Sequence, residues 1–95
     1  MTSIQIFDTV WDAVEVLPAT AMNMRIRSEL MIAVQQAIGA WDATQSDAAK
    51  RLGITQPRLN DLLRGSIQKF SLDALANLAR RAGLDLRIEV TRPAA

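Results

Sequence analysis

Apolar residues recur at helical spacing from the first part of this chain onward. The first stripe consists of Phe7, Val10, Trp11 and Val14. These positions follow i, i+3, i+4 and i+7, the spacing of one helix face, and Asp8 can cap the helix at its start. Pro18 lacks the amide that a helix interior requires. We therefore expect a short first helix that begins near Asp8 and ends before Pro18.

A second stripe predicts the longest helix of the chain, from about Ala21 to Trp41. Its apolar face consists of Ile26, Leu30, Ala33, Val34, Ala37, Ile38 and Trp41. The residues expected to face solvent are Arg25, Arg27, Glu29, Gln35 and Gln36. Because the stripe covers one side only, we expect this helix to pack against other elements along that side.

Two short helices with a glycine between them follow the long helix. Thr44 offers a hydroxyl cap, and Asp47 places a negative charge in the first turn, where the unpaired amides favour it. We expect this helix to end at Leu52, because Gly53 can adopt the left-handed conformation without steric cost. The chain can therefore turn sharply at this glycine.

The second short helix follows Thr55, which can cap it. Pro57 lies in its first turn, where a missing amide costs no intrahelical hydrogen bond, and Gly65 ends the run. The residues expected to face inward are Leu59, Leu62 and Leu63. We expect the opposite face, made of polar side chains, to be open to solvent or to a ligand.

A final helix and a strand complete the pattern. Ser71 can cap the helix and Gly83 can stop it. The apolar positions of this helix are Leu72, Leu75, Leu78, Ala79 and Ala82. The residues that then alternate with polar ones are Leu84, Leu86, Ile88 and Val90. Alternation is the period of a half-buried strand, and a strand needs a hydrogen-bonded neighbour.

These elements predict a mostly α protein, a compact five-helix bundle with a short C-terminal β-strand. We expect residues 1–20 to form an arm and a short helix, and residues 21–83 to form the helical domain. Residues 84–91 would be the strand, with a role in dimerisation, and 92–95 a disordered tail. At 95 residues the chain has room for one core.

The composition removes most catalytic chemistry. The chain has no histidine and no cysteine, so it lacks the commonest general base, the commonest metal ligands and any disulfide. We expect no enzyme activity, no cofactor and no metal. No apolar run is long enough to span a membrane, and we expect a soluble, cytoplasmic protein.

Residues 45–64 carry the functional pattern. Ala48 and Ala49 leave room for two helices to cross closely, and Gly53 makes the turn between them. The side chains expected on the outer face of the second helix are Gln56, Pro57, Asn60, Asp61 and Arg64. This geometry is typical of a helix-turn-helix, whose second helix enters the major groove of DNA. The net charge of +1 adds little support, although residues 42–70 hold five cations against three acids.

The same segment, with Gly65 and the Phe70-Ser-Leu-Asp-Ala-Leu stretch, resembles the Cro/repressor-type (XRE family) helix-turn-helix of lambda-repressor-like proteins. The likeness spans roughly Met24 to Val90 and is closest to HigA-like antitoxins. It implies that Gln45 contacts a phosphate and buttresses Gln56, which can pair with adenine N6 and N7.

Two positions depart from the family pattern. The resemblance places Pro57 and Asp61 where side chains often touch bases. Proline has no donor for a base edge, and aspartate can accept from cytosine N4 but repels phosphates, so only the docking mode transfers. The candidate DNA-binding residues are Gln45, Thr55, Gln56, Pro57, Arg58, Asn60, Asp61, Arg64, Gln68 and Lys69.

These observations predict a homodimer that binds a double-stranded operator and represses transcription. The HigA-like resemblance implies that it is the antitoxin of a type II pair, which autoregulates its operon and neutralises a RelE/HigB-type toxin. Two alternatives are a plain Cro/repressor-type transcription factor and a protein-interaction module without DNA binding. The strand at 84–91 could pair with its copy, with residues 4–7, or with a toxin strand.

Overall fold

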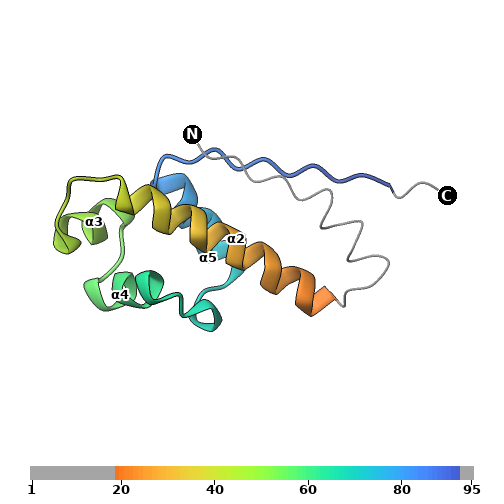
Figure 1. Cartoon of the computed structure of the whole chain (residues 1–95), viewed down its shortest axis with the longest axis horizontal. Coiled ribbons are helices and arrows are strands. Elements are labelled where there is room, and N and C mark those ends of the chain that lie inside the picture. The colour runs from red at the N-terminus through yellow and green to blue at the C-terminus, as the bar shows by residue number, and fades with distance from the viewer. Residues whose placement is uncertain (1–18, 93–95) are drawn as a thin grey trace.

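The computed structural model describes residues 19–92. Within this range the chain forms four α-helices and one 3₁₀ helix (Figure 1). They are α2 (Ala19–Gly39), α3 (Gln45–Leu52), α4 (Gln56–Arg64), η1 (Ile67–Lys69) and α5 (Leu72–Arg81). The mostly helical class is confirmed. The helix expected before Pro18 lies outside the described residues, as do residues 93–95 of the expected tail.

Helix α2 runs through the middle of the molecule and organises the other elements. It packs along α5 and also contacts η1 and α4, while α3 contacts α4 and α5 (Figure 1). The side chains buried between these helices are Leu30, Met31, Val34, Ala48, Ala49, Leu52, Leu59, Leu62, Phe70, Leu75, Leu78, Ala79 and Ala82. All are apolar, so burial of hydrophobic surface is the main force that fixes the arrangement.

The predicted apolar face of α2 is largely confirmed. Leu30, Ala33 and Val34 are buried, and the remaining members pack partly buried against the core. The helix lies two residues earlier than expected at both ends, so Trp41 follows it instead of ending it. Met31 was not predicted to face inward, yet it is only 3% exposed. The buried stripe of α2 is therefore wider than its sequence pattern indicated.

The C-terminal strand is a prediction that the structure does not show. Residues 84–92 have no regular secondary structure and extend along α2 (Figure 1). The amide of Leu84 still donates to the carbonyl of Ala79 at 3.0 Å, but beyond it the described chain offers this backbone no hydrogen-bond partner. A strand is defined by a paired neighbour, and none of the described residues supplies one.

Only the first half of the predicted strand stripe packs on the helices. Leu84 and Leu86 are half-buried against the core, whereas Ile88 is 60% and Val90 75% exposed. A mainly apolar hollow of 300 Å³ lies beneath this segment, lined by Ile26, Leu30, Leu72, Asp73, Ala76, Leu86 and Ile88. None of the described helices has the length and hydropathy needed to cross a membrane.

Candidate nucleic-acid interface

Helix α3 begins and ends at the residues that the sequence indicates. The Thr44 hydroxyl oxygen accepts a hydrogen bond from the Asp47 amide at 3.1 Å, which caps the first turn. Gly53 follows the helix with φ of 72°, and the Ile54 amide donates back to the Ala49 carbonyl at 3.0 Å. This closure satisfies carbonyls at the helix end and turns the chain toward α4.

Helix α4 begins after a turn of three residues and has the same kind of cap as α3. The Thr55 hydroxyl oxygen accepts from the Arg58 amide at 3.2 Å, and Pro57 lies in the first turn. The helix ends at Gly65, where φ is 79° and the Ser66 amide donates to the Asp61 carbonyl at 3.0 Å. Both ends of this short helix are therefore fixed by local chemistry, which sets its length and direction.

The inner face of α4 holds it firmly against the other helices. Leu59 and Leu62 are fully buried, as predicted. The prediction for Leu63 is wrong, because this residue is 38% exposed. It is turned by about 100° from Leu62 around the helix axis, so it lies at the margin of a narrow buried arc. The outer face gains an apolar side chain beside the polar ones.

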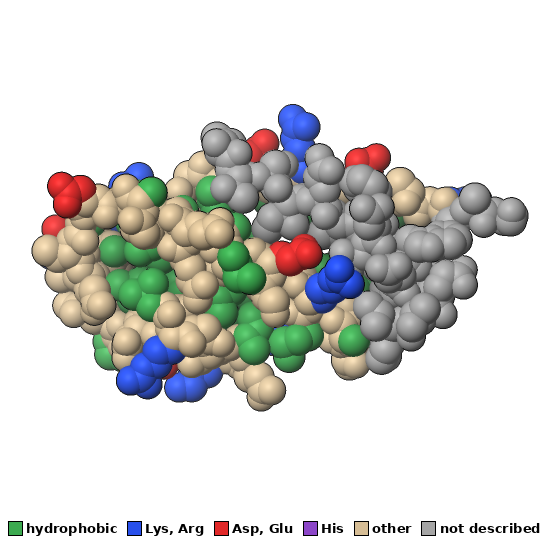
Figure 2. Space-filling model, viewed as in Figure 1, with side chains coloured by type: hydrophobic (Ala, Val, Ile, Leu, Met, Phe, Trp, Pro, Cys, Tyr) green, Lys and Arg blue, Asp and Glu red, His purple; other side chains and the backbone are tan. Residues whose placement is uncertain are grey.

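The outer face of α4 presents most of the predicted DNA-binding residues to solvent. The exposed polar and proline residues of this face are Gln56, Pro57, Asn60 and Arg64, whereas Asp61 is only partly exposed. Figure 2 shows Lys and Arg side chains gathered at the lower edge of the molecule, in the region of α4 and the turn that follows. A helix of this kind fits the width of the major groove. The cations near it complement the negative charge of the phosphates.

Two side chains of α2 hold the chain that follows α4. The Gln35 amide nitrogen donates to the Leu62 carbonyl at 2.8 Å. Arg27 Nη1 donates to the Phe70 carbonyl at 3.2 Å and to the Ile67 carbonyl at 3.5 Å. Both residues were predicted to face solvent, and that prediction is wrong. Their donors instead satisfy carbonyls at the end of α4 and around η1.

A spacing signal could have located these two residues. Arg27, Met31 and Gln35 recur every four positions, so they form one stripe along α2, and Met31 at its centre is buried. A buried apolar residue between two long polar side chains indicates a face that packs at its centre and donates hydrogen bonds at its flanks. Arg27 and Gln35 therefore hold the chain around η1 next to α4.

Arg58 is fixed by the loop and is only partly available to a ligand. Its guanidinium lies 4.0 Å from the centre of the Phe70 ring, and Nη1 donates to the Lys69 carbonyl at 2.6 Å. Phe70 is itself 1% exposed, so it anchors this arrangement to the core. Arg58 thus ties η1 to α4, and its remaining N–H groups are the ones that could reach DNA.

Lys69 forms an ion pair with Asp61 across the same junction. The Nζ to Oδ1 distance is 3.3 Å, and the side chains are 61% and 24% exposed. The sequence suggested no partner for Lys69, because the two residues are eight positions apart and on different elements. The ion pair places a cation against the one acidic side chain of α4.

The remaining candidates differ in how they are placed. Gln45 and Gln56 open α3 and α4, both exposed, and no hydrogen bond joins their side chains. Gln68 is exposed on η1. The oxygen of Thr55 is engaged in the helix cap, but its hydroxyl proton can still donate. The buttress implied by the family resemblance is therefore not formed in the free protein.

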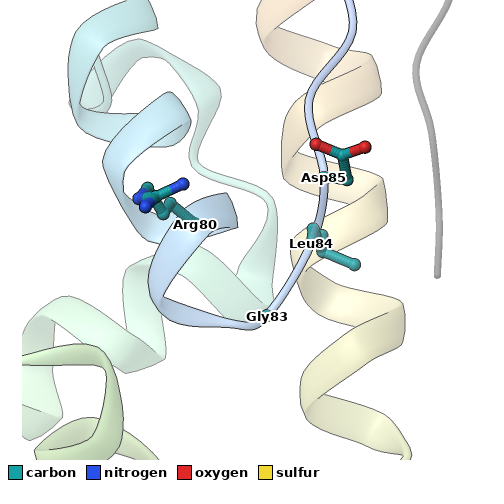
Figure 3. A pocket seen from close by; sticks show the side chains of 4 residues that line it. All are labelled: Arg80, Gly83, Leu84 and Asp85. Carbon is teal, nitrogen blue, oxygen red and sulfur yellow. The ribbon is translucent and has the colours of Figure 1, made fainter.

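A second surface hollow lies at the end of α5, away from α4. This hollow of 440 Å³ is lined by four residues, labelled in Figure 3: Arg80, Gly83, Leu84 and Asp85. Arg80 and Asp85 are not paired with each other, because Asp85 lies 3.7 Å from Nε of Arg87, and the remaining lining residues are Gly83 and Leu84, which carry no nucleophile. Among the described residues, no group of three or more acidic side chains could hold a metal ion. The outer face of α4, with its exposed polar side chains and nearby cations, is therefore the better candidate for a binding site.

Comparison with known proteins agrees with this geometry. Residues 14–91 match a family model described as a helix-turn-helix domain. The match covers most of the chain and includes α3, the turn at Gly53 and α4. No curated protein matches the sequence significantly.

Proposed function

The chain belongs to the helix-turn-helix domain family, and on that premise we propose that it is a sequence-specific transcriptional repressor. The observation that carries the proposal is the outer face of α4. Gln56, Asn60 and Arg64 are exposed there, on a helix whose ends and inner face are fixed. A helix that is already ordered can enter the major groove without a further loss of conformational entropy.

Sequence would be read first at the start of α4. Gln56 is the first residue of the helix, and its amide can donate to N7 and accept from N6 of adenine. Arg64 at the other end, and Gln68 on η1, are placed to contact phosphates on either side of the groove. Base contacts would specify the site, and phosphate contacts would fix the register.

Selection of DNA from a random pool by the purified protein tests this proposal. We expect one enriched motif, and we expect Gln56→Ala to relax discrimination at one base pair by about 1–3 kcal/mol. Gln36→Ala is the matched control, because Gln36 is an exposed glutamine on α2. A parent protein that enriches no motif, and whose binding does not depend on salt, would instead favour a protein-interaction module.

We propose further that the repressor acts as a homodimer assembled through residues 84–92. The backbone of this segment has donors and acceptors without described partners, and Ile88 and Val90 are exposed on it. Pairing of two such segments would satisfy those groups and bury both side chains. A dimer would also place two copies of α4 about one DNA turn, roughly 34 Å, apart on a palindromic operator.

A second candidate function is that of an antitoxin. It rests on the resemblance to HigA-like antitoxins and on the same extended segment, which could add as a strand to a RelE/HigB-type toxin. Co-expression with the product of a neighbouring gene tests it. Rescue of growth, and co-purification that is lost when residues 84–95 are removed, would support this role over that of a stand-alone repressor.

A further inference from the structure

The Asp61–Lys69 ion pair places a positive charge beside the acidic residue of α4. An aspartate on the recognition helix should repel DNA phosphates, yet the site keeps one. Lys69 Nζ lies 3.3 Å from Oδ1 of that carboxylate. Resting on the proposed function, we propose that Asp61 reads the N4 amino group of a cytosine in the major groove, with Lys69 compensating its charge.

The junction between α4 and η1 holds this pair in place. Arg58 precedes Asp61 by one helical turn, so the two residues lie on the same side of α4. Arg58 donates to the backbone carbonyl of Lys69, and Phe70 beneath it is anchored in the core. These contacts set the backbone of Lys69 at a fixed position relative to Asp61.

The chemistry of the pair selects the base. A carboxylate accepts hydrogen bonds and cannot donate, and cytosine N4 is a donor in the major groove, whereas guanine and thymine present acceptors. Adenine N6 also donates, but its neighbouring N7 acceptor would face the carboxylate unfavourably. Lys69 occupies Oδ1, which leaves Oδ2 to accept from the base.

We expect the ion pair to contribute little to the stability of the fold. Its main electrostatic effect would be on the approach of DNA. Lys69 is 61% exposed, and pairs of this kind stabilise proteins weakly because water and side-chain entropy oppose them. Near DNA the carboxylate would otherwise stand in a strongly negative field. The positive charge of Lys69, 3.3 Å from Oδ1, would offset that repulsion.

Three variants test the inference by selection from random DNA and by binding as a function of salt. Asp61→Ala should lose a preference for cytosine at one position, about tenfold, and should bind unrelated DNA more tightly because Lys69 is released to phosphate. Asp61→Asn should change that position toward adenine. Lys69→Ala should keep the cytosine preference but bind every sequence more weakly.

The control and the contrary outcomes separate this inference from the proposed function. Asp73→Ala removes an exposed carboxylate from α5 and should leave the motif unchanged. A parent that enriches no motif contradicts the proposed function. A parent with a motif that Asp61→Ala and Asp61→Asn both reproduce contradicts the reading by Asp61 alone. Loss of the cytosine preference in Lys69→Ala would show that the lysine, and not the carboxylate, selects the base.

Discussion

The junction between α4 and η1 and the C-terminal segment, residues 84–92, differ in how many of their backbone hydrogen-bonding groups have partners within the described chain. At the junction, donors from Arg27, Gln35 and Arg58 reach backbone carbonyls, and Phe70 is buried beneath them. Along residues 84–92 the described chain supplies no backbone partner after Leu84. The described residues therefore satisfy the backbone of the junction but not that of the C-terminal segment.

The contrast between the two regions corresponds to two different physical requirements. A helix that reads bases must hold its side chains in one place, so its supporting loop is fixed by hydrogen bonds and burial. A segment that assembles with a partner can leave its backbone groups to water until pairing occurs, because exposed groups are satisfied by solvent. We expect substitutions in the two regions to affect folding and assembly independently.

The largest effect is expected from removing the anchor of the junction. Phe70→Ala should lower the free energy of unfolding by about 3–5 kcal/mol, because the ring is 1% exposed and a cavity would replace it. Val90→Ala in the C-terminal segment should change it by less than about 0.5 kcal/mol, since the side chain is 75% exposed. Urea denaturation at one low protein concentration compares the two. Equal losses would mean that the segment is part of the core.

A smaller effect is expected at the turn between α3 and α4. Gly53 has φ of 72°, and a Cβ there would lie 2.7 Å from Nη1 of Arg81. Gly53→Ala should cost about 1–2 kcal/mol of unfolding free energy through the left-handed backbone, since the arginine tip can move away. Gly39→Ala, in a helix with open space around it, should be neutral or slightly stabilising. A turn that tolerates alanine as well as Gly39 does would contradict the assignment of strain.

Arg58→Ala should cause a still smaller loss of stability. This change removes the contact with the Phe70 ring and the bond to the Lys69 carbonyl, about 1 kcal/mol of stability. DNA binding should weaken more than stability, because η1 would no longer be fixed relative to α4. Arg80→Ala, an exposed arginine on α5, is the control. Thermal unfolding and DNA binding measured on both variants show whether the two losses separate.

The smallest effect on folding is expected from Ile88→Pro. The residue is 60% exposed and its amide has no described partner, so the folded monomer should lose less than about 0.5 kcal/mol. Assembly should suffer, because proline removes a donor from the proposed strand pair. We expect sedimentation to shift toward monomer, and binding to a palindrome to weaken more than binding to one half-site. A parent that is monomeric at micromolar concentration yet protects a palindrome would contradict the dimer.

The starts and stops of the three shorter α-helices follow from the amino-acid sequence alone. Thr44, Thr55 and Ser71 act as caps because a hydroxyl three residues before an amide closes a helix start whatever surrounds it. Gly53 and Gly65 stop helices because the left-handed conformation favours glycine. Periodicity also located most of the core, since a helix face is fixed by spacing alone.

The roles of the polar side chains depend instead on how the helices and loops pack together. The roles of Arg27 and Gln35, and the pairing of Lys69 with Asp61, depend on which loop passes beside which helix. The exposure of Leu63 depends on how much of α4 its neighbours cover. The alternation of residues 84–91 indicated a strand, but pairing is a property of two segments, and one segment's pattern cannot supply the second.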